Sequence, residues 1–141
     1  MADPRAAVSY EGIGYEAETF AHDDTIVFDA TKKGGSAQVG LAVTLESNKT
    51  ASLVGDGENV LGKLIKVEPD GFCVVQTGGH MTLPGGSGAT LTAGLKIVGD
   101  LGSGSAEGYI QAVSTQDTVS RGMIIDSTTA TAVVVRMEKA A

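Results

Sequence analysis

Glycine-rich turn signals interrupt this chain roughly every ten residues, and the stretches between them are short runs of Val, Ile, Leu and Thr. Twenty of the 141 residues are glycine, about twice the average usage of roughly 7%. Strands of about five residues at this spacing are typical of sandwiches and barrels. One helical turn, near residues 88–93 or 114–120, is the most we expect. The sequence predicts an all-β fold with a small β-barrel or sandwich-like body.

The expected strands follow these runs. They cover residues 25–28, 38–46, 51–54, 60–67, 72–76, 80–83, 95–98, 108–113, 122–125 and 130–137. The segment Glu68-Pro69-Asp70-Gly71 has the chemistry of a tight hairpin loop, so residues 60–67 and 72–76 are expected to pair. The pair Gly78-Gly79 is expected to separate residues 72–76 from residues 80–83.

The core has few aromatic residues to draw on. The chain contains no Trp, three Phe and three Tyr, so Val, Ile, Leu and Ala must fill the interior. Cys73 is the sole cysteine and lies in the apolar run Phe72-Cys73-Val74-Val75. No internal disulfide can form, and we expect a buried, unreactive thiol.

Charge and hydropathy bear on the choice of partner. The formal net charge is −7, and the ten basic residues are scattered, with Lys32-Lys33 as their one adjacent pair. Phosphate binding requires clustered Lys and Arg, so we expect no nucleic-acid partner. No stretch approaches about 18 consecutive apolar residues, so we expect no membrane span. The segment after Met1 has no apolar run typical of a signal peptide, and we expect synthesis in the cytoplasm.

Residues 1–22 differ from the rest of the chain. They hold three of the six aromatic residues, at Tyr10, Tyr15 and Phe20, together with a cluster of acids and two glycines. We interpret the segment as an extended N-terminal arm, and residues 23–141 as the β-barrel-like body. A frayed terminus is the alternative. Aromatic side chains are costly to expose in a frayed tail, which favours an arm that binds a partner.

The sequence offers little for catalysis. His22 and His80 lack companions at the usual spacing of metal ligands. His22-Asp23-Asp24 could contact a metal, but a polar turn is the simpler interpretation. Ser87, Ser103 and Ser105 lie in glycine-rich loops, and no Gly-x-Ser-x-Gly motif in a strand–turn–helix context offers a nucleophile. We expect no enzyme, no metal and no cofactor, with a small hydrolase as one remaining rival. A biotinyl- or lipoyl-carrier domain is a weaker one, because Lys63 and Lys66 lie inside an expected strand.

Residues 61–79, LGKLIKVEPDGFCVVQTGG, resemble the central hairpin of the small capsid decoration (cement) proteins of tailed bacteriophages. In the pattern of that family, a strand of the form Gly-x-Ile-x-x-Val meets a turn containing Asp-Gly, and an apolar strand then runs to another Gly. Residues 90–98 are similar to a second element of that family. Residues 122–125 and 133–137 look like its closing strands. The likeness covers residues 38–137 and consists of glycines and aliphatic residues.

The resemblance implies a lambda-like head decoration protein of the virion. Such a protein forms a homotrimer on the outside of an expanded head, sits at local three-fold positions and bridges major capsid subunits. In that family an N-terminal arm often becomes ordered on the capsid surface. Here the arm would bind through Tyr10, Ile13, Tyr15 and Phe20. Another virion surface, tail or fibre β-module, including a glycan-binding one, is the alternative.

Overall fold

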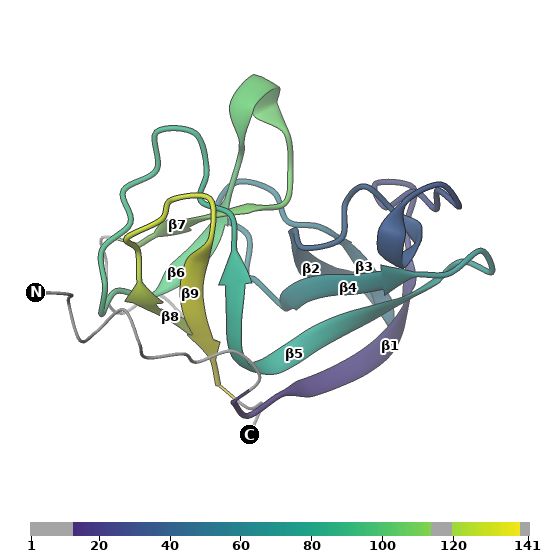
Figure 1. The fold of residues 1–141 in the computed structure, drawn as a ribbon, viewed down its shortest axis with the longest axis horizontal. Helices are drawn as coiled ribbons and strands as arrows, with labels where there is room; N and C mark the ends of the chain where they lie inside the picture. The colour runs from purple at the N-terminus through teal and green to yellow at the C-terminus, as the bar shows by residue number, and fades with distance from the viewer. Residues whose placement is uncertain (1–12, 114–119, 139–141) are drawn as a thin grey trace, which may run out of the picture.

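A computed structural model describes residues 13–113 and 120–138 and confirms the all-β fold (Figure 1). Within these ranges, no helical turn has the length or hydrophobicity needed to cross a membrane. The elements are β1 (Glu16–His22), η2 (Lys33–Gly35), β2 (Ala42–Ser47), β3 (Thr50–Leu53), β4 (Gly62–Val67), β5 (Phe72–Leu83), β6 (Ile97–Asp100), η3 (Ser103–Ser105), β7 (Tyr109–Ala112), β8 (Gly122–Asp126) and β9 (Val133–Met137). The η elements are short 3-10 turns, and residues 88–93 form no helical turn.

Strands β1 to β5 form a closed barrel. Their order is β1-β3-β2-β4-β5, and β1 pairs with β5 to complete the ring. The β4–β5 hairpin turns at the predicted loop, with Val67 opposite Cys73. Aliphatic side chains and the one cysteine fill the interior, which we call the first core. Its buried members are Ile26, Val43, Ala51, Leu53, Leu64, Val67, Cys73 and Val75.

The second half of β5 belongs to another ring of strands, so that β5 lies between the two groups in Figure 1. It pairs with β9, and β9 pairs with β8. The β6–β7 hairpin completes the ring through two single bridges, Lys96 to Met123 and Gly85 to Ile110. This ring encloses the second core. Its buried members are Ala42, Val54, Val60, Met81, Leu83, Ile97, Ile110, Ile124, Val133, Val135 and Met137.

Strand β5 continues through Gly78 and Gly79, so the predicted separation at this glycine pair is wrong. The reason is a close approach by another part of the backbone. Gly79 has φ +90°, and a Cβ there would lie 2.5 Å from the carbonyl oxygens of Ile13 and Gly14. Glycine inside a strand often marks such an approach. Here it marks the place where the chain before β1 crosses β5.

Residues 25–28 are not a strand, contrary to the prediction. The side chain of Gln38 takes the place of a neighbouring strand. Its Nε2 donates to the carbonyl of Thr25 at 2.6 Å, and its Oε1 accepts from the N–H of Val27 at 2.8 Å. These bonds satisfy the backbone without a sheet ladder. The segment is apolar because Ile26 is buried in the first core and not because it forms a strand.

The boundary that we placed after residue 22 does not coincide with a boundary in the structure. Residues 16–22 form β1, which pairs with β5 from Glu16 to Ala21 and closes the barrel. Residues 1–12, the remainder of the predicted arm, lie outside the described residues.

Cys73 is fully buried in the first core, as expected. Burial raises the pKa of its thiol to about 11, because a thiolate is poorly solvated in an apolar interior. We expect a disulfide reagent to leave the native protein unlabelled at pH 8 and to label one thiol per chain in denaturant. Stoichiometric labelling of the native protein would contradict this expectation.

The same thiol makes stability depend on pH. In the unfolded chain it ionises near its ordinary pKa of 9.0, whereas in the folded protein it stays protonated up to about pH 11. Unfolding then releases a proton, so this contribution to the free energy of unfolding is complete below pH 9 and declines as the pH rises toward 11. In Cys73→Ala this part of the decline should be absent in denaturant titrations.

Candidate functional site

The structure separates the four residues that we assigned to capsid binding. Ile13 and Tyr15 each expose 52% of their surface. Phe20 is only partly exposed and packs against the first core. Tyr10 lies outside the described residues. Ile13 and Tyr15 are thus the described members of the set that are available for an external contact, and Phe20 stabilises the barrel.

Strand β5 fixes the segment that carries these two side chains. The backbone N–H of His80 donates to the carbonyl oxygen of Ile13 at 2.9 Å, and His80 Nδ1 lies 3.4 Å from the same oxygen. A Cβ on Gly14 would lie 3.3 Å from the Cα of Gly79. The absence of side chains on both glycines therefore allows the two backbones to touch. His80 lies in a strand, as predicted, and its ring is hydrogen-bonded.

A groove of about 370 Å³ opens at this crossing. It is lined by Ile13, Gly14 and Glu16, by residues 78–80 and by residues 136–138. Ile13 is its exposed hydrophobic side chain, whereas Met137 is buried in the second core. Glu16, Arg136 and Glu138 contribute charged side chains to the lining. A shallow apolar groove beside two exposed hydrophobic side chains suits contact with another protein surface. We call Ile13, Tyr15 and this groove the binding edge.

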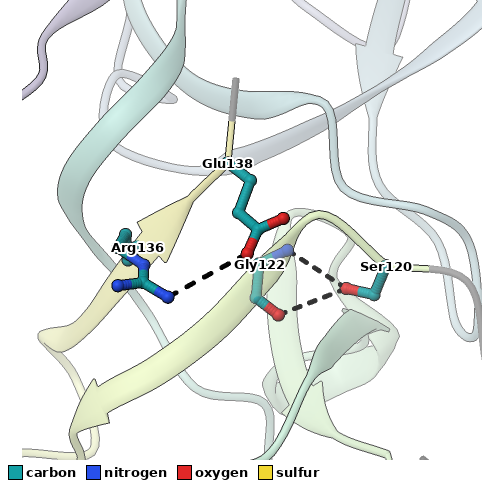
Figure 2. A network of polar contacts seen from close by, with 4 residues as sticks. All are labelled: Ser120, Gly122, Arg136 and Glu138. Carbon is teal, nitrogen blue, oxygen red and sulfur yellow. Dashed lines mark hydrogen bonds and ion pairs between the residues drawn. The ribbon is translucent and has the colours of Figure 1, made fainter. Parts of the chain in front are cut away.

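The far side of the groove is the end of β9, which hydrogen bonds hold against the start of β8. Arg136 and Glu138 form an ion pair (Figure 2), in which Nη2 of Arg136 lies 3.9 Å from Oε1 of Glu138. The backbone N–H of Glu138 donates to the carbonyl of Arg121 at 2.7 Å. In the same view the Oγ of Ser120 lies 3.2 Å from the N–H of Gly122, which donates to it. These bonds place the Arg136–Glu138 pair at the rim of the groove.

The polar turn His22-Asp23-Asp24 was the sequence's candidate for metal contact. His22 ends β1, and its Nδ1 lies 2.9 Å from the carbonyl oxygen of Asp23. The carboxylate of Asp23 accepts the N–H of Thr25 at 3.0 Å. Both side chains thus stabilise the turn that comes after β1. Over the described ranges, no group of three or more His, Cys, Asp or Glu side chains is placed to hold a metal ion.

Acidic side chains gather near this turn. The pKa of the Glu46 carboxyl is raised, first by a hydrogen bond with the Asp23 carboxyl and then by repulsion from Asp23, Asp24 and Glu58. Proton sharing between two nearby carboxyls relieves their mutual repulsion. The cluster lies at the surface and adds to the acidic character of the barrel.

The sequence did not indicate which residues lie across the groove from Ile13. Gly79, Arg136 and Met137 complete the groove, yet they are far from Ile13 in the chain. The one available signal was the glycine pair inside an apolar run, which we interpreted as a turn. Arg121 was also overlooked. Its guanidinium donates to the carbonyls of Leu61 at 2.7 Å and Thr77 at 2.9 Å, and so joins the start of β8 to the barrel.

Comparison of the chain with protein-family models, with curated proteins and with solved structures found no match. The function must therefore be inferred from the sequence and from the binding edge.

Proposed function

We propose that this chain is a non-enzymatic structural protein that decorates the outside of an expanded bacteriophage head. It would act as a homotrimer at local three-fold positions and stabilise the shell by bridging major capsid subunits, without nucleic acid, membrane or cofactor. The resemblance of residues 61–79 to the hairpin of cement proteins supports the proposal. Binding the expanded lattice and not its precursor would stabilise that lattice by mass action.

The exposed pair at the binding edge is the observation that carries the proposal. Ile13 and Tyr15 are held at the point where the chain enters the barrel, and each leaves 52% of its surface in solvent. Large side chains anchored to a rigid strand lose little conformational entropy on binding. In a symmetric shell, many weak copies of such a contact act together, and avidity makes the decoration hard to remove.

The rival function is a virion, tail or fibre module that binds glycans. The structure has a hollow of about 590 Å³, lined by Glu58, Asn59 and Arg121 among others. Sugars usually stack on exposed aromatic rings, and none of the described residues that line this hollow is aromatic. The hollow therefore lacks the ring on which a sugar would stack, and it receives less weight than the binding edge.

Cosedimentation with expanded heads tests the proposal. The heads are assembled from the major capsid protein encoded in the same genome. We expect wild-type protein to saturate them as a trimer and Ile13→Ser/Tyr15→Ser to bind about ten- to a hundredfold more weakly. Burying the exposed half of each side chain contributes about 0.7–1.4 kcal/mol to binding, and the double variant loses both contributions.

Val27→Ser is the matched control, since Val27 exposes 59% of its surface and is not among the residues that line the groove. Its affinity for heads should equal that of wild type. A wild-type protein that stays monomeric and does not cosediment with expanded heads would overturn the proposed function. Equal binding by the double variant would overturn the role of the binding edge.

A further inference from the structure

Strand β1 has one open edge among the described residues. On one side it pairs with β5 along its length, from Glu16 to Ala21. On the other side β3 reaches only its last two residues, Ala21 and His22. The barrel therefore closes over a short contact, and the first part of β1 extends beyond it. Residues 17–19 are exposed.

Hydrogen-bond directions identify the backbone groups on this edge. The N–H of Ala21 donates toward β3, to the carbonyl of Lys49 at 2.9 Å, whereas that of His22 donates toward β5, to Gly71 at 3.1 Å. Backbone groups alternate in direction along a strand. Ala17 and Thr19 therefore point their N–H and C=O groups to the open side. Within the described part of the chain, neither residue has a hydrogen-bond partner on that side.

The surroundings of this edge bear on what can bind to it. Proteins often protect an open edge with proline, inward-pointing charges or a bulge. Here the irregularity in pairing lies before Ala17, between Glu16 and Ala17, and no proline occurs in β1. Ala17 and Thr19 have small side chains. Glu18 is exposed between them, which gives the edge a negative charge.

We propose that this edge accepts an extended, basic segment of the major capsid protein as an added strand. The inference rests on the proposed function and specifies how the partner is held. The backbone of Ala17 and Thr19 offers two donors and two acceptors, the groups that strand addition uses. A Lys or Arg of the incoming strand faces Glu18. Strand β1 begins directly after Tyr15. Its open side and the binding edge therefore form one continuous surface.

Thr19→Pro tests this arrangement, with Thr19→Ala as its control. Proline lacks the N–H that faces the open edge, and it is tolerated on edge strands where that N–H faces solvent. The pairing of β1 with β5 uses the groups of Glu18 and Phe20 and stays intact. We expect both variants to unfold near the wild-type temperature. Thr19→Pro should bind expanded heads at least tenfold more weakly, and Thr19→Ala within twofold of wild type.

Hydrogen exchange provides a measurement on the unaltered protein. The amide of Thr19 should exchange rapidly in the free protein and at least tenfold more slowly on decorated heads. Because this measurement uses the wild-type protein, it tests strand addition at β1 even if Thr19→Pro fails to fold. Glu18→Gln should weaken binding a few-fold at low salt and reduce its salt dependence.

Four outcomes would overturn the proposal. The first two are equal binding by a folded Thr19→Pro and an unprotected Thr19 amide on the heads. A third is slow exchange of Thr19 in the free protein, since the edge is then covered by the chain itself. The fourth is a change of oligomeric state in Thr19→Pro, which assigns the edge to a second copy. If wild type binds heads and only these tests fail, the decoration function stands; if wild type does not bind heads, both ideas fail.

Discussion

Gly79→Ala is expected to lower the free energy of unfolding by roughly 3–5 kcal/mol. Two effects combine at this residue. Its φ of +90° is unfavourable for alanine, and the new Cβ would lie 2.5 Å from the carbonyl oxygens of Ile13 and Gly14. The crossing segment must move away, which breaks the hydrogen bond from the His80 N–H to Ile13. Binding to heads should fall with it, because Tyr15 comes directly after the displaced residues.

Gly71→Ala separates the two effects. Gly71 also has φ +90°, but a Cβ there would meet nothing within 4 Å. Only the backbone conformation is penalised, and we expect a loss of roughly 1–2 kcal/mol. Denaturant unfolding of both variants measures the difference. Equal losses for Gly71→Ala and Gly79→Ala would show that the close approach of residues 13–14 to β5 contributes nothing to stability.

Truncation of either core should also have a large effect. Leu64 fills the first core and Leu83 the second, and both are fully buried. Each change to alanine removes apolar contacts and leaves a cavity, so we expect losses of about 2–5 kcal/mol. Leu45→Ala is the matched control, because Leu45 exposes 49% of its surface. Its loss should stay below about 1 kcal/mol.

The double variant Leu64→Ala/Leu83→Ala tests whether the two rings of strands unfold together. Leu64 and Leu83 belong to different clusters of buried residues, so their effects should add. Strand β5 runs through both rings, and Ala42, from the barrel, is buried in the second core. We therefore expect one cooperative transition in wild type and variants. Two separate transitions by circular dichroism would show that the rings are independent folding units.

Local sequence signals predicted much of the fold. Alternating aliphatic runs and glycine-rich turns indicated the all-β class, and the hairpin at residues 68–71 was correctly placed, because its turn chemistry acts within four consecutive residues. The burial of Cys73 was evident from the apolar run around it. Ile13 and Tyr15 were named as capsid anchors through the family resemblance, together with Tyr10 and Phe20, and their role stays a prediction.

Errors arose where a residue has more than one structural use. Glycine serves turns and close backbone contacts equally well, so the pair at 78–79 was interpreted as a turn although a distant segment crosses there. Residues 25–28 look like a strand, but the side chain of Gln38 satisfies their backbone. Both outcomes depend on residues more than ten positions away.

The sequence by itself therefore determined the fold class and the aliphatic composition of the core. Only the tertiary structure decided that β1 belongs to the barrel, that β5 is shared between two rings, and that β9 supplies the other wall of the groove. The physical reason is that hydrophobic patterning sets which face of a strand is buried, whereas pairing between distant strands sets which neighbour it meets.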